Sequence, residues 1–144
     1  MAYRHRQVGT LTLVLLLGIV LLMGIAVEFG WNPVAVAVLC VLTMLGGLFY
    51  SMTVEIHEAT LEWSFGPGLI RRQTALAEIR NVQVVRNPWY YGWGIHWTPR
   101  GWLFNVGGFG AVAITLASGK RYRIGTDEPQ TLAEAIRQAA GLGA

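Results

Sequence analysis

The fold depends on the stretch VGTLTLVLLLGIVLLMGIAV, from Val8 to Val27, and on VAVAVLCVLTMLGGLFYSM, from Val34 to Met52, which follows a short polar break. Neither run contains Asp, Glu, Lys, Arg or His. Each has about the twenty apolar residues that a helix needs to cross a hydrocarbon core, and neither shows the 3.6-residue period of an amphipathic helix. The sequence therefore predicts two transmembrane helices, at about 8–27 and 34–52.

The break between the runs is too short for a domain, so residues 1–52 are predicted to form an antiparallel helical hairpin. Arg4, His5 and Arg6 precede the first helix, whereas Glu28 is the only charge in the connection. The positive-inside rule then places both termini in the cytoplasm. A cleaved signal peptide is the alternative, but the first run is longer than the roughly 7–15 apolar residues of such signals. We therefore expect a multi-pass membrane protein.

Residues 53–144 follow with almost no linker and suffice for one small domain. Apolar and polar residues alternate in two segments between 53 and 65, which is typical of strands with one buried face. Similar patterns and regular turns continue to about residue 124 and predict about seven antiparallel strands. The period then changes, because Leu132 and Ile136 fall on one face of a helix. We expect this helix to cap a sandwich or barrel.

Three segments carry a resemblance to a known family: TVEIHEATLEWSFGPGLIRR at 53–72, NPWYYGWGIHWTPRGWLFNV at 87–106 and SGKRYRIGTDEP at 118–129. With the order of apolar helices, strands and C-terminal helix, they resemble bacterial membrane-anchored proteins that have a cytoplasmic pleckstrin-homology-like (PH-like) domain. The molecular role of that family is largely undefined. The resemblance implies a PH-like β-sandwich over residues 53–144, capped by the C-terminal α-helix, and a location in the bacterial inner membrane.

Signatures of catalysis and of metal binding are missing from the sequence. The histidines His5, His57 and His96 are not spaced as metal ligands, although the last two could meet across strands. No serine lies in a nucleophile elbow. The three glutamates between 55 and 62 are most simply the solvated side of a hairpin. We therefore predict a protein that is not an enzyme and holds no cofactor.

The basic residues offer one candidate site. They outnumber the acidic residues 11 to 8, a surplus too small and too scattered to indicate nucleic acid. Arg71 and Arg72 lie near a strand turn, and Arg121 and Arg123 are expected to point outward together from one strand. Against an anionic membrane each arginine would gain about 1 kcal/mol, so these four are candidates for binding lipid headgroups. The alternative is an ordinary solvated strand face.

The aromatic residues between Pro88 and Trp97 offer a second candidate. Because successive strand residues point to opposite faces, some of these rings are expected to lie outside the core. They either insert into a lipid interface, contact a partner protein or complete the core. The candidates for a partner or membrane interface are Trp89, Tyr90, Tyr91, Trp93 and Trp97.

Together these features predict a non-enzymatic, membrane-anchored adaptor or binding module that contacts a membrane protein, or a second copy of itself, through the aromatic segment. One alternative is a lipid-facing module that reads anionic headgroups through the arginines. Another is an accessory subunit of a larger membrane complex. The expected partners are therefore membrane lipids and a membrane protein or homo-oligomer, and not nucleic acid.

Overall fold

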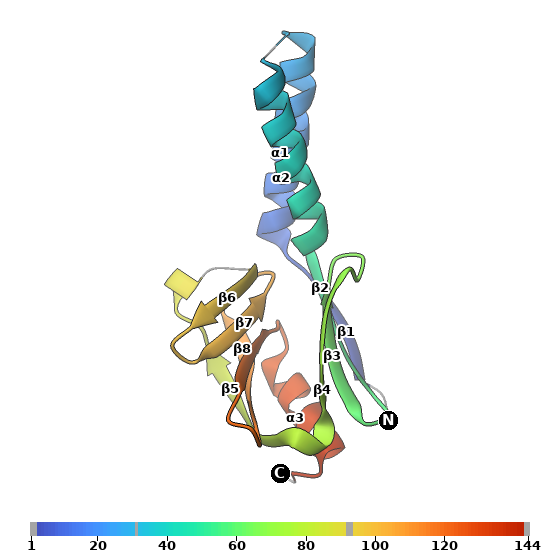
Figure 1. Ribbon diagram of the computed structural model, residues 1–144, viewed down its shortest axis with the longest axis vertical. Helices are drawn as coiled ribbons and strands as arrows, with labels where there is room; N and C mark the ends of the chain where they lie inside the picture. The colour runs from blue at the N-terminus through green and yellow to red at the C-terminus, as the bar shows by residue number, and fades with distance from the viewer. Residues whose placement is uncertain (1–2, 31, 92–93, 143–144) are drawn as a thin grey trace.

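The computed structural model describes residues 3–30, 32–91 and 94–142, with the backbone alone for Leu11. A helical hairpin stands on a two-layered β domain (Figure 1). Over the described residues the elements are β1 (Tyr3–Val8), α1 (Thr10–Glu28), α2 (Pro33–Phe49), β2 (Ser51–His57), β3 (Thr60–Phe65), β4 (Ile70–Ala75), η1 (Leu76–Glu78), β5 (Ile79–Arg86), η2 (Trp89–Tyr91), β6 (Gly94–Thr98), β7 (Gly101–Asn105), β8 (Gly110–Leu116), β9 (Arg121–Gly125) and α3 (Pro129–Ala140).

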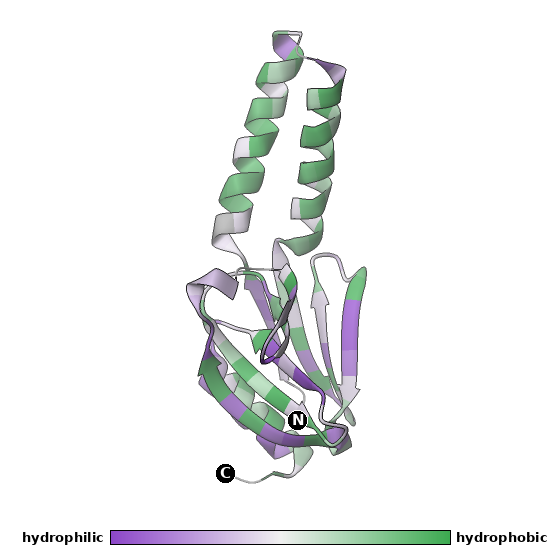
Figure 2. Cartoon of the chain, turned by 60° about the vertical axis from the view of Figure 1, so that its left-hand side comes forward, coloured by the Kyte–Doolittle hydropathy of each residue, from purple (hydrophilic) through white to green (hydrophobic). Residues whose placement is uncertain are grey.

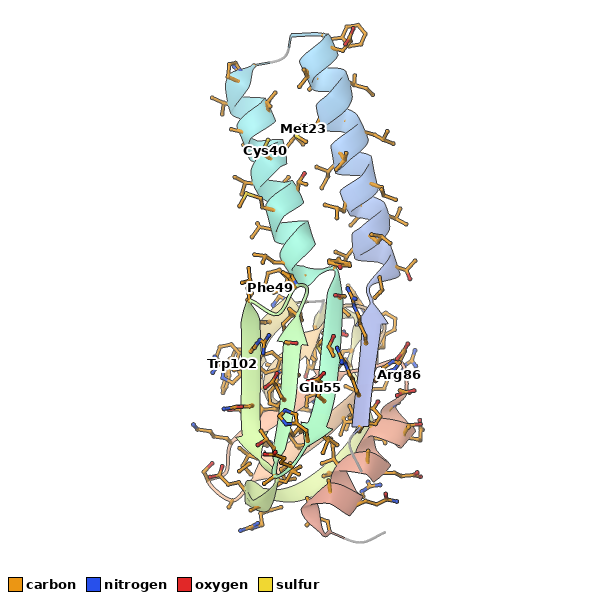
Figure 3. The ribbon with its side chains drawn as sticks, turned by 90° about the vertical axis from the view of Figure 1, so that its right-hand side faces the viewer. Met23, Cys40, Phe49, Glu55, Arg86 and Trp102 are labelled. Carbon is orange, nitrogen blue, oxygen red and sulfur yellow. The ribbon has the colours of Figure 1, made fainter. Side chains whose placement is uncertain are left out.

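The hairpin consists of α1 and α2. Asn32 caps α2, because its side-chain Oδ1 accepts a hydrogen bond from the Val34 N–H at 2.7 Å. Between the helices, Cys40 Sγ lies 3.5 Å from Met23 Sδ (Figure 3). Apolar residues extend along both helices (Figure 2), and no described side chain of α2 is buried. Continuous apolar surface on this scale marks a contact surface.

The structure contradicts the two predicted membrane spans. Among the described residues, no helix is long and apolar enough to cross a membrane. The predicted runs are too long because Val8, Ser51 and Met52 belong to strands. This finding corrects the transmembrane hairpin, the inner-membrane location and the cytoplasmic placement of the termini.

The hairpin is inserted between two paired strands. β1 precedes it, β2 follows it, and the two are antiparallel, with Val8 opposite Ser51. The sequence pattern did not predict β1. Its less exposed side chains are those of Tyr3, His5 and Gln7, so the strand has no alternation of apolar with polar residues that would reveal it.

The strands form two sheets. Sheet A is four-stranded, with the order β1-β2-β3-β4, and all its pairs are antiparallel. Sheet B is five-stranded, with the order β5-β8-β9-β7-β6, and its β7–β9 pair is parallel. The prediction of about seven antiparallel strands is therefore wrong in the number of strands and in one pairing. Because β8 lies between β7 and β9 in sequence, no local pattern indicated that they pair.

The core lies between the inner faces of the sheets. Trp63 of sheet A contacts Phe104 and Tyr122 of sheet B, with ring centroids 5.3 and 5.6 Å away. Along one side of the sandwich, α3 covers the gap between β2 and the strands β5 and β8 (Figure 1). Leu132 and Ile136 of α3 are fully buried there. We call this side of the sandwich, covered by α3, the closed side.

Polar contacts fasten β1 to the residues just before α3. The Tyr3 hydroxyl donates a hydrogen bond to Glu128, and His5 Nε2 lies 2.6 Å from Asp127 Oδ1. Burial raises the pKa of Tyr3, and the hydrogen bond to Glu128 raises it further. The closed side is therefore held by polar contacts at its edge as well as by apolar packing.

Candidate functional site

The opposite side of the sandwich, between β4 and β6, is open. A row of side chains across sheet B shows the difference between its two ends. Residues paired on adjacent strands form this row, in the order Val82, Ile114, Tyr122, Trp102 and Trp97. Paired residues of neighbouring strands point to the same face. Val82 is 4% exposed and Ile114 fully buried, whereas Trp102 is 41% and Trp97 70% exposed. The inner face of sheet B is thus covered at β5 and uncovered at β6.

Sheet A ends too early to cover these indole rings. Its last strand is β4, where Arg72 lies opposite Trp63 in the register. Because Trp63 is a core residue, Arg72 starts from the inner face of sheet A, yet it is exposed. Figure 3 shows Trp102 beside β4, at the edge of sheet A that faces away from α3. A cation of one sheet and two indoles of the other therefore meet at the open side.

A cavity of about 440 Å³ lies between these strands, within the range of ligand-binding pockets. Among the residues that the structure describes, no acidic side chain lines it, and its small lining residues are Pro99, Gly101 and Gly119. A second cavity of about 510 Å³ continues along β4 and shares Lys120 and Tyr122 with the first. We call the first cavity the open-side groove, and its charged and aromatic residues are Arg72, Lys120, Arg121, Trp97, Trp102 and Tyr122.

A tight turn between β6 and β7 holds the two indole rings. The Thr98 hydroxyl donates a hydrogen bond to the Gly101 carbonyl at 2.6 Å. Gly101 has a φ of +113°, and a Cβ there would lie 2.4 Å from the carbonyl oxygen of Arg121, so the turn requires glycine. The rings of Trp97 and Trp102 pack edge to face, with centroids 5.3 Å apart. The turn that carries the two rings is therefore fixed by the fold.

The structure brings together two of the four predicted arginines. Arg72 and Arg121 line the groove with Lys120. Arg71 lies on the other face of β4, and its Nη1 is 3.6 Å from Glu62 Oε1. Over the described ranges, no ion pair involves Arg72, Arg121 or Lys120. The groove is therefore lined by three cationic residues that make no ion pair within the described ranges, and Glu78 lines the adjoining second cavity with Lys120.

Arg123 lies elsewhere and differs from its prediction. It belongs to the outer face of sheet B, as expected, but its side chain is buried. Its Nη1 donates a hydrogen bond to Asn87 Oδ1 at 2.8 Å, and its guanidinium carbon lies 5.9 Å from the centre of the Tyr91 ring. Burial lowers the pKa of Arg123, which Tyr91 partly offsets. Arg123 thus fastens the aromatic segment to sheet B.

Of the predicted aromatic residues, as of the arginines, some line the groove and others lie elsewhere. Trp89 and Tyr90 are exposed on η2, and Trp89 lines a separate cavity. Tyr91 is half-buried against Arg123. Trp97 lines the groove, whereas Trp93 lies outside the described residues. The prediction missed Trp102, although its alternation with buried Phe104 was a signal that it starts from the inner face.

The groove offers guanidinium and ammonium groups beside indole and phenol rings. Such groups bind anions and flat apolar groups. Within the part of the chain that the structure describes, no group of three or more His, Cys, Asp or Glu side chains could hold a metal ion. The chemistry that the groove supports is recognition of an anionic and apolar surface.

No family model matches the chain, and no curated protein matches it. The resemblance to PH-like proteins therefore stays a prediction, as does the absence of enzymatic activity.

Proposed function

We propose that this chain is a non-enzymatic binding module that holds a protein partner in the open-side groove. The supporting observation is the row across sheet B, in which two adjacent indole rings of an inner sheet face remain exposed. Tryptophan and arginine are enriched among the residues that contribute most of the binding energy at protein interfaces. The groove combines both types, with Trp97 and Trp102 facing Arg72.

The rigidity of the groove supports the same proposal. Because the Thr98–Gly101 hydrogen bond and the close approach of the turn to β9 fix the backbone that carries the indole rings, a partner does not have to order this turn on binding. Preformed surfaces lose less entropy on association than mobile ones. Burying the apolar surface of Trp97 and Trp102 then contributes about 25 cal/mol per Å² to binding.

The test uses the full-length chain, kept dispersed by a mild non-ionic detergent that covers the apolar hairpin. We compare the proteins that co-purify in stoichiometric amount with the wild type, Trp97→Ala and Trp89→Ala. Trp89 is the matched control, since it is also an exposed tryptophan but lies outside the groove. The expected result is a partner that Trp89→Ala retains and Trp97→Ala loses.

Retention of the same partner by Trp97→Ala would contradict the proposal. So would recovery of the wild-type chain with no protein bound in the groove. Thermal unfolding of each variant, measured alongside, separates loss of binding from loss of fold. If the retained molecule is a second copy of the chain, the mass of the complex shows it.

A further inference from the structure

The free edge of β4 adjoins the open-side groove. β4 is the last strand of sheet A, and an edge strand presents backbone N–H and C=O groups that can pair with another strand. The next strand position lies about 4.8 Å beyond β4. On this side of sheet A, Trp97 and Trp102 are the inner-face residues of sheet B that lack a cover.

We propose that an extended, acidic segment of a partner protein adds to sheet A as a fifth strand beside β4. This inference rests on the function proposed above and specifies the partner. Side chains of an added strand alternate between the two faces of the sheet. Those on the inner face would lie against Trp97 and Trp102 and beside Arg72. We therefore expect an aromatic or aliphatic residue and an acidic residue on this face, two positions apart in the sequence.

The charges of the groove support an acidic partner. Arg72, Lys120 and Arg121 are among its lining residues, and none of the described residues that line it is acidic. Arg71, the neighbour of Arg72 on the other face of β4, has Glu62 at 3.6 Å. A strand edge can carry charges simply to prevent aggregation. That function does not account for two exposed indole rings at the same edge, because exposed aromatic surface promotes association.

The same charges disfavour a second copy of the chain as the occupant. If two β4 strands paired antiparallel about Arg72, this arginine would lie directly opposite its copy on the inner face. Like charges directly opposite each other in a sheet are destabilising. The groove therefore favours a different chain, one whose strand carries the opposite charge.

The first experiment selects random displayed peptides of about ten residues, long enough for a strand, on the full-length protein in non-ionic detergent. We expect the enriched peptides to carry Asp or Glu two positions away from an aromatic residue, so that both side chains lie on the same face of the strand. Reversing the groove charge with Arg72→Glu should weaken their binding by about tenfold or more. The matched variant Arg71→Glu, one residue away on the other face, should change it by less than about twofold.

A second measurement tests the added strand itself. The best peptide is synthesised in two forms, each N-methylated at every second backbone nitrogen, in opposite phase. In a β-strand, alternate N–H groups point to opposite edges, so only one phase blocks pairing with β4. We expect one form to lose binding and the other to retain it. Equal binding by the two forms would overturn strand addition.

Enriched peptides without an acidic bias, an equal response to Arg72→Glu and Arg71→Glu, or no enrichment would each overturn the inference. So would Arg72-dependent binding of phosphatidylserine vesicles with no peptide selected, since the groove would then take a lipid headgroup. If Trp97→Ala still loses the co-purified partner in any of these cases, the proposed function stands and only the strand inference fails.

Discussion

The gap between the two sheets reaches the surface at two sides of the sandwich, and the chain covers it at the closed side but not at the open side. At the closed side, α3 covers the gap between the sheets, and Leu132 and Ile136 are fully buried. At the open side, the same inner face of sheet B ends in exposed Trp102 and Trp97, with Arg72 across from them. The chain's own helix covers the closed side, whereas the open side leaves aromatic and cationic side chains exposed.

Residues that stabilise the fold and residues that are available for recognition thus lie on different sides of the sandwich. A side chain such as Leu132 contributes its apolar surface to folding. A side chain such as Trp97 leaves most of that contribution unrealised in the isolated chain, so it remains for a partner to use. Substitutions at the two sides should therefore affect different measurements.

The largest expected effect is at the closed side. Leu132→Ala removes a fully buried side chain and leaves a cavity between α3 and the two sheets, so the free energy of unfolding should fall by about 2–5 kcal/mol. Chemical denaturation monitored by tryptophan fluorescence measures it. A loss below about 1 kcal/mol would mean that α3 does not close the sandwich.

Gly101→Ala should be next in size, since it breaks the turn that supports the groove. A Cβ at a φ of +113°, only 2.4 Å from the Arg121 carbonyl oxygen, forces β6 and β7 away from β9. The expected cost is about 1–3 kcal/mol of stability, with weaker binding of the selected peptide. An unchanged thermal midpoint together with unchanged peptide affinity would show that the turn does not position the indole rings.

Tyr3→Phe tests the polar fastening of the closed side. Loss of the hydrogen bond to Glu128 should cost about 1.5–3 kcal/mol at neutral pH, since the acceptor is charged. The raised pKa of Tyr3 means that, above about pH 10, the unfolded chain releases a proton that the folded chain retains. The advantage of the wild type over Tyr3→Phe should therefore be complete below that pH and shrink above it. A difference in unfolding free energy that stays constant into alkaline solution would contradict this.

The smallest expected effect on stability is at the open side. Because Trp97 is largely exposed, Trp97→Ala should change the free energy of unfolding by no more than about 0.5 kcal/mol, while it abolishes partner retention. Equilibrium denaturation checks the first expectation. If Trp97→Ala destabilises the chain as much as Leu132→Ala does, then both sides contribute equally to the stability of the fold, and the open side is not reserved for binding.

The sequence predicted the elements whose signal is local. The positions of α1 and α2 followed from two apolar runs, and the spacing of Leu132 and Ile136 identified α3. Hydropathy could not show where a helix stops and an apolar strand begins, so Val8 and Met52 were included in the helices. β1 was missed because Tyr3, His5 and Gln7 occupy the positions where apolar residues would reveal a strand.

The groove could not be predicted, because it joins residues from distant strands. Arg72, Trp97 and Lys120 meet only once the β7–β9 pairing and the end of sheet A at β4 are known. Strand alternation correctly placed Arg123 on the outer face of its sheet. Its burial depends on Asn87 and Tyr91, which reach it from another segment.

The insertion of the helical hairpin between β1 and β2 also bears on the order of folding. Val8 and Ser51 pair directly, so β1 can join sheet A only by closing the whole loop that separates them. Closing this loop costs conformational entropy. The cost is smaller once α1 and α2 have paired, because their pairing brings the two ends of the loop together. The N-terminal strand, and with it the contacts of Tyr3 and His5 before α3, should therefore form after the helices have paired.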